Sequence, residues 1–147
     1  MNRDPRTDGL TWISPQAMIQ LRLDAGKLSL SDPAEQYVPE MAGLEYLTTD
    51  APAITIENLL TMTAGFPEDN PWGDRQLDEP VSMLQELING GISFSNPPSH
   101  RFEYSNTGYA LLGAIIREVS GLSYQEYIRE HILEPLGMYQ TYWEIDK

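Results

Sequence analysis

The segment from Tyr109 to Ser120 constrains the fold of this chain most, because its apolar residues occupy nearly every side of a helix. A helix that is apolar all round belongs in the middle of a core, so other elements must cover it. Gly108 and Gly113 are expected to allow close packing there, since a helical glycine otherwise costs about 1 kcal/mol against alanine. The apolar residues are Ala110, Leu111, Leu112, Ala114, Ile115, Ile116 and Val119.

Capping signals and apolar spacing predict four further helices. Ser14 followed by Pro15 is typical of a helix start. Thr55 can cap a short helix, and Ser123 with Glu126 forms a capping box for the last one. The expected helices are about 14–25 before Gly26, 55–61 before Ala64-Gly65, 80–88 before Gly90-Gly91, and 123–133.

A single globular unit is the expected organisation of residues 1–147. With 41% hydrophobic residues, the chain can bury one moderate core. Residues 28–52 are predicted to be mostly loop, because proline and glycine punctuate them. Little β-strand is expected, so the predicted fold class is mainly α.

Charge and residue types argue against several classes of function. The net charge of −13 and the pI near 4.3 argue against a nucleic-acid partner, because a polyphosphate requires a basic face. Without cysteine there is no disulfide, thiolate nucleophile or sulfur-ligated zinc. The two histidines, His100 and His131, lie far apart in the sequence, so no metal site is expected. No cofactor is expected either.

Hydropathy gives no sign of targeting or membrane insertion. The amino terminus has no apolar core resembling a signal peptide, and no stretch approaches the roughly 18 apolar residues of a membrane span. The sequence therefore predicts a soluble chain without a membrane span or an export signal, and it leaves the localisation undecided.

The triplet Tyr104-Ser105-Asn106 precedes the central helix, expected at about 107–120. The positive end of a helix dipole favours a phenolate, so Tyr104 at this place can act as a base. Alternatively, Tyr104 is a half-buried aromatic residue and Asn106 caps the helix. Three residues with a free middle position do not decide between these interpretations.

Longer matches around this triplet resemble the class C β-lactamase-related serine hydrolases. This family includes class C β-lactamases, D-Ala-D-Ala carboxypeptidases, D-aminopeptidases and some esterases. The similarity extends over roughly residues 6–143 and implies the helical region of an α+β fold, with most of its antiparallel sheet missing. The matching stretches are Phe102 to Gly121, Glu134 to Met138, Thr55 to Phe66, and Asp24 to Pro33.

The resemblance assigns roles to the triplet. In the family a serine nucleophile lies in Ser-x-x-Lys at the head of a helix, and the lysine and a tyrosine relay its proton. Tyr104 would then be the general base, and Asn106 would hydrogen-bond the lysine or the substrate's amide. A third motif, Lys-Thr-Gly or a His-x-Gly relative, is expected beyond the end of this chain.

The first motif is replaced in this register. Counted back from Gly26, the serine and lysine positions hold Gly9 and Trp12. Ser14 is the nearest hydroxyl, but Ala17 stands three residues later in place of lysine, so a helix cap is its expected role. Tyr104 and Asn106 are therefore expected to be vestigial in this chain.

Three hypotheses follow for the function. The first is a β-lactamase-like serine hydrolase domain for a β-lactam, a D-Ala peptide or an ester, inactive as this chain alone. The second is a non-catalytic module that binds a peptide or a partner in the old cleft, and the third is a second chain that completes the sheet. Self-association through the exposed sheet-facing surface is also expected. Family members are often extracytoplasmic.

Two other groups of residues have the types found in cation-binding or catalytic sites. Acidic residues surround Trp72, which is a candidate border of the cleft, but their spacing matches no calcium loop, and a solvated loop is expected. His131 and Glu134 have catalytic residue types, although capping or surface placement is the commoner role. The acidic residues are Glu68, Asp69, Asp74, Asp78 and Glu79.

Overall fold

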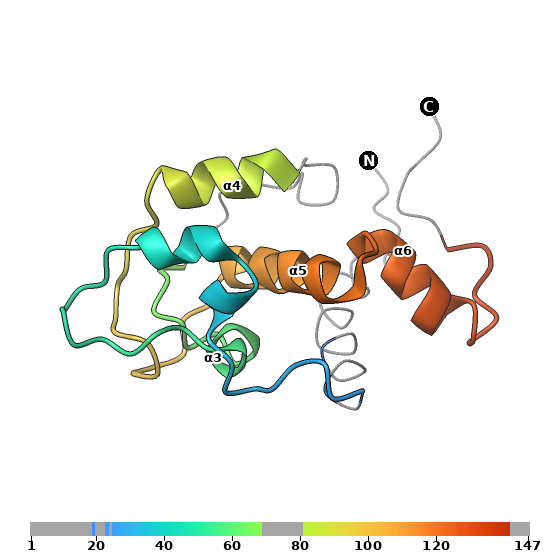
Figure 1. Cartoon of the computed structure of the whole chain (residues 1–147), viewed down its shortest axis with the longest axis horizontal. Helices are drawn as coiled ribbons and strands as arrows, with labels where there is room; N and C mark the ends of the chain where they lie inside the picture. The colour runs from blue at the N-terminus through green and yellow to red at the C-terminus, as the bar shows by residue number, and fades with distance from the viewer. Residues whose placement is uncertain (1–18, 20–22, 24, 69–80, 142–147) are drawn as a thin grey trace.

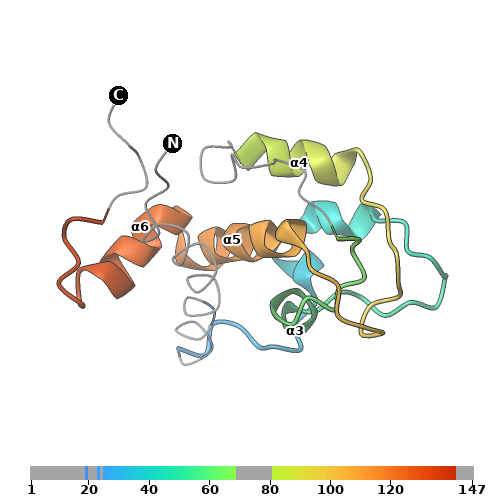
Figure 2. The same cartoon turned by 180° about the vertical axis from the view of Figure 1, so that it is seen from behind.

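The computed structural model describes residues 19, 23, 25–68 and 81–141. Figures 1 and 2 show one helix, α5, in the middle, with the other α-helices against its sides and its C-terminal end. This part of the chain contains no strand beyond an isolated antiparallel bridge between Pro33 and Thr55. The elements are η1 (Ala34–Gln36), η2 (Pro39–Gly43), α3 (Ile56–Leu60), α4 (Val81–Asn89), α5 (Asn106–Ser120), α6 (Tyr124–Ile128) and η3 (Arg129–Leu133).

The central position predicted for α5 is confirmed, since α5 contacts α3, α4 and α6. Its apolar side chains from Leu111 to Ile116 form the middle of the core. A methyl group on Gly108 would approach Leu59 of α3 to 3.9 Å, and one on Gly113 would approach Tyr124 to 3.7 Å. Both are ordinary van der Waals distances, so these contacts have room for a methyl group and little more.

The predicted helix starts are confirmed at α3 and α6. Thr55 Oγ1 accepts a hydrogen bond from the Asn58 N–H at 3.2 Å, and Asn58 Oδ1 accepts one from the Thr55 N–H at 3.1 Å. Ser123 and Glu126 form the same reciprocal pair at α6. The last helix runs to Leu133 as expected, but it changes from α to π geometry at Arg129.

The helix expected at about 14–25 lies mostly outside the described residues. Ile19 and Leu23 are both helical, and Ile19 is fully buried. The Gly26 N–H donates to the Leu23 carbonyl oxygen at 2.9 Å, and its φ of +65° is the left-handed geometry of a helix end.

Residues 28–52 contain two short 3₁₀ helices within the predicted loop. Pro33 and Pro39 stand at their starts, where the fixed φ of proline suits a tight turn. The Tyr37 hydroxyl donates to Asp32 Oδ2 at 2.6 Å. Burial, followed by the hydrogen bond to the Asp32 carboxylate, raises the pKa of Tyr37 to about 12. Asp32 also accepts the Ile56 N–H through its carbonyl oxygen, which attaches this region to α3.

Candidate active site

Tyr104, Ser105 and Asn106 lie at the head of α5. Ser105 has extended geometry, and its Oγ accepts a hydrogen bond from the Gly108 N–H at 3.2 Å. Ser105 is therefore the helix cap and Asn106 is the first helical residue, so the interpretation of Asn106 as the cap is wrong. Tyr104 is half-buried, as that same interpretation expected.

The two side chains predicted to act together do meet. The Tyr104 hydroxyl donates to Asn106 Oδ1 at 3.1 Å. A phenol that donates to a neutral amide holds its proton, whereas a general base must accept one. The two residues are thus joined by a hydrogen bond at the head of α5.

Two segments that precede this pair in the sequence are hydrogen-bonded to each other. They are residues 61–68, called here the post-α3 segment, and residues 95–103, called the pre-motif loop. Carbonyl groups of the first accept backbone N–H groups of the second. The bonds run from Ser95 to Gly65 at 2.9 Å, from Ser99 to Thr63 at 2.8 Å and from Glu103 to Met62 at 2.9 Å. Tyr104 thus follows a loop that is fixed along its length.

The backbone of both segments adopts left-handed geometry at three places. Met62, with a φ of +54°, lies one residue beyond the cap of α3 in the position that usually holds glycine. Ser99 has a φ of +67°, and its hydroxyl accepts a hydrogen bond from Asn58 Nδ2 at 2.9 Å. Such residues cost of order 1 kcal/mol or more and persist where surrounding contacts fix them.

Gly65 is the third, with a φ of +87°. A Cβ built on Gly65 would lie 2.1 Å from the carbonyl oxygen of Asn96, so the two segments approach too closely for any side chain. Only glycine meets both requirements here.

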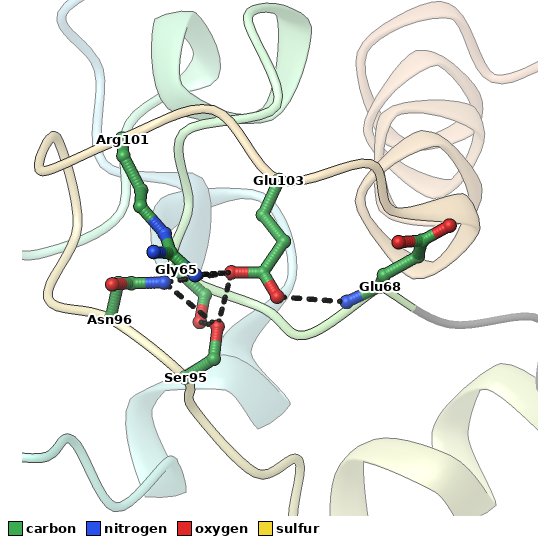
Figure 3. A network of polar contacts seen from close by, with 6 residues as sticks. All are labelled: Gly65, Glu68, Ser95, Asn96, Arg101 and Glu103. Carbon is green, nitrogen blue, oxygen red and sulfur yellow. Dashed lines mark hydrogen bonds and ion pairs between the residues drawn. The ribbon is translucent and has the colours of Figure 1, made fainter.

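A carboxylate joins the same segments beside the motif (Figure 3). Glu103 Oε2 accepts from Ser95 Oγ at 2.5 Å and from Asn96 Nδ2 at 2.7 Å, and Glu103 Oε1 accepts from the Glu68 N–H at 3.2 Å. Arg101 forms an ion pair with it at 3.5 Å. The hydrogen bond from the Ser95 hydroxyl is the largest of the effects that lower the pKa of Glu103. Glu103 could not be predicted as part of this site from the sequence, since an acidic residue beside a motif gives no signal until its partners are placed.

The histidine and glutamate on the last helix do not form a site with each other. His131 Nδ1 lies 3.1 Å from the Tyr127 carbonyl oxygen, and its ring stacks on that of Tyr127. Glu134 is exposed and pairs with Arg129 at 3.7 Å. Both residues have the surface placement that was predicted for them.

Other predicted site residues fall where nothing is described. Gly9, Trp12 and Ser14 lie outside the described residues, as do Trp72 and the acidic residues from Asp69 to Glu79. Glu68 is described and exposed. The described residues include no cluster of metal-ligating side chains, and none of their helices is long and apolar enough to cross a membrane.

Comparison with known proteins gives a consistent result. The β-lactamase family model matches residues 17–147 of this chain. Protein flp of Staphylococcus aureus (strain MW2) is 36% identical over 118 residues, which are 79% of this chain and 23% of that protein. Penicillin-binding protein 4* of Bacillus subtilis (strain 168) is 32% identical over 123 residues, which are 80% of this chain and 26% of that protein.

A solved structure agrees with this assignment. The octameric penicillin-binding protein homologue from Pyrococcus abyssi is 35% identical and superimposes with a TM-score of 0.69, over 88% of this chain and 30% of that chain. The chain therefore belongs to the β-lactamase family of serine hydrolases and has the helical part of the fold shared by β-lactamases and penicillin-binding proteins. It spans about a quarter of the length of the curated relatives it matches.

Replacing Gly65 by alanine tests the close approach that fixes the pre-motif loop. We expect Gly65→Ala to destabilise the chain by several kcal/mol, about 1 kcal/mol from the left-handed backbone and the rest from the overlap with Asn96. Gly91→Ala is the matched control, because Gly91 has a φ of +86° but nothing within 4 Å of its added methyl group. Urea unfolding of both variants measures the difference, and equal losses would contradict the crowding argument.

Proposed function

We propose that this chain supplies the tyrosine and asparagine wall of a serine hydrolase cleft. The cleft would transfer an acyl group to water from a β-lactam, a D-Ala peptide or an ester. The observation that carries the proposal is the contact between Tyr104 and Asn106 at the head of α5, with 3.1 Å between the hydroxyl and the amide oxygen. The family assignment supplies the class of reaction.

In this proposal Tyr104 is the general base and Asn106 binds the lysine of the first motif or the amide of the substrate. To act as a base, Tyr104 must lose the proton that it now donates to Asn106. A cation beside the phenol promotes that loss, because an opposite charge favours the ionised form. In the proposed cleft a lysine beside the phenol would therefore activate Tyr104 as the base.

We also propose that the chain alone does not turn over substrate. Gly9 and Trp12 occupy the serine and lysine positions in the family register, so these positions hold no hydroxyl to attack a carbonyl carbon and no amine to relay a proton. Without a nucleophile the Tyr104 and Asn106 pair keeps only its hydrogen-bonding capacity. This supports a second function for the chain, reversible binding of a peptide-like ligand.

Covalent labelling tests the first of these functions. We expect no band when the purified chain is treated with a fluorescent penicillin and run on a denaturing gel, since loss of the nucleophile removes about six orders of magnitude of rate. A purified class C β-lactamase, labelled in parallel, is the positive control. A labelled band would contradict the proposed inactivity, and its loss in Ser14→Ala would identify Ser14 as the nucleophile.

Reversible binding is measured separately, by the fluorescence anisotropy of the same penicillin. We expect Tyr104→Phe to weaken binding by about threefold to tenfold, the effect of one hydrogen bond. Tyr139→Phe removes the same hydroxyl from a side chain that is 71% exposed, and it should bind like the unmodified chain. Equal affinities for the two variants would contradict a role of Tyr104 in the binding site.

Self-association is the partner interaction that we propose. Exposed apolar residues occur between Leu136 and Tyr139, and a relative from Pyrococcus abyssi is an octamer. We expect sedimentation velocity to show a mass above 16.6 kDa that decreases in Leu136→Ser. Leu111→Ser is unsuitable because Leu111 is fully buried. A monomer at every concentration would contradict the proposal.

A further inference from the structure

We propose that Glu103 is a positioning residue, whose carboxylate fixes the backbone that places Tyr104 at the head of α5. The inference rests on the proposed function only for the task that it gives to Tyr104. Its geometry is independent of any substrate, because every contact that carries it lies within the pre-motif loop or between that loop and the post-α3 segment.

The first argument is the number of segments that one side chain connects. The Glu103 carboxylate accepts hydrogen bonds from Glu68 in the post-α3 segment, and from Ser95 and Asn96 at the start of the pre-motif loop. Figure 3 shows the carboxylate between these groups. The Glu103 N–H also donates to the Met62 carbonyl oxygen at 2.9 Å. The residue immediately before Tyr104 is therefore held by both its backbone and its side chain.

The second argument is that apolar burial does not hold this part of the loop. The four residues from Ser99 to Phe102 are all exposed, and Phe102 is 65% exposed. Only 18% of the Glu103 side chain is exposed. Polar contacts therefore decide where the backbone before Tyr104 lies, and the Glu103 carboxylate contacts Ser95, Asn96, Arg101 and the Glu68 N–H.

The third argument concerns charge and buried polar groups. Asn96 is 8% exposed, and its side-chain amide donates a hydrogen bond to Glu103. Loss of the carboxylate would therefore remove a hydrogen-bond acceptor from a buried N–H donor. Four donors converge on the two carboxylate oxygens, an arrangement that suits the ionised acid. The charged groups around it are Arg101, which pairs with it, and Glu68, whose carboxylate is directed away in Figure 3.

The sign of the pH dependence follows from these contacts. The hydrogen bond from Ser95, with the other donors, lowers the pKa of Glu103 in the folded chain. The set of contacts to the ionised Glu103 carboxylate is therefore complete above the ordinary glutamate pKa of about 4.3. It is lost as pH falls below that value through the lowered pKa of Glu103. A neutral glutamine cannot titrate and should lack the full set of contacts at any pH.

The test uses the purified chain with 3-fluorotyrosine, observed by ¹⁹F NMR. The Tyr104 signal is assigned by its loss in Tyr104→Phe. We expect Glu103→Gln at about pH 7 to shift or broaden this signal, and the unmodified chain to show the same change only below about pH 4.3. Amide exchange at Ser95, Ser99 and Glu103 should become about tenfold faster in the variant, as for one lost hydrogen bond to a charged group.

Glu126→Gln is the matched control. Glu126 also accepts from a serine hydroxyl, that of Ser123 at 2.6 Å, and this bond is the main effect that lowers its pKa. Its removal should weaken the start of α6 and leave the Tyr104 signal unchanged. A Tyr104 signal in Glu103→Gln identical to that of the unmodified chain at about pH 7 would overturn the proposal.

A second variant covers the case in which Glu103→Gln does not fold. Ser95→Ala removes one donor and leaves the carboxylate, so a smaller shift of the Tyr104 signal is expected, and an unchanged signal would overturn the proposal. No penicillin enters these measurements. A chain that binds no penicillin but shows the Glu103 effect would contradict the proposed function alone, and the reverse result would contradict only the positioning role.

Discussion

The hydrogen bonds between the post-α3 segment and the pre-motif loop are the interaction on which the candidate site depends. The carbonyl groups of Met62, Thr63 and Gly65 in the turn after α3 accept backbone N–H groups of a loop that has few buried side chains. Because Gly65 lacks a Cβ, the two backbones approach closely enough for these bonds to form. The position of Tyr104 is thus set by backbone contacts made before the helix begins.

The buried helix α5 provides the other half of this placement. Its apolar side chains fix its axis within the core, while Ser105 satisfies the N–H of Gly108 at its start. Capping by Ser105 leaves Asn106 as a helical residue whose side chain meets Tyr104. A rigid helix and a fixed loop together hold two polar side chains in one geometry, which is what a binding or catalytic wall requires.

The Tyr104 and Asn106 pair forms within this segment of the chain. A hydrogen bond between two side chains two residues apart needs the helix start and the loop that leads into it, so it does not depend on the residues at the Ser-x-x-Lys positions. Acyl transfer requires more, since a nucleophile and a cation must come from another part of the fold. The same wall is therefore compatible with a working hydrolase cleft and with a site that only binds.

The sequence by itself determined α3, α4, α5 and α6, the caps of α3 and α6 at Thr55 and Ser123, and the Tyr104 motif with its family. These features depend on contacts within a few residues or on the apolar pattern of one helix, so the order of residues specifies them. Only the tertiary structure decided the contact of Glu103 with the Glu68 N–H and the pairing of Asn58 with Ser99, which join residues 35 and 41 positions apart. Those hydrogen bonds exist because packing brings distant segments together, and no local pattern encodes that distance.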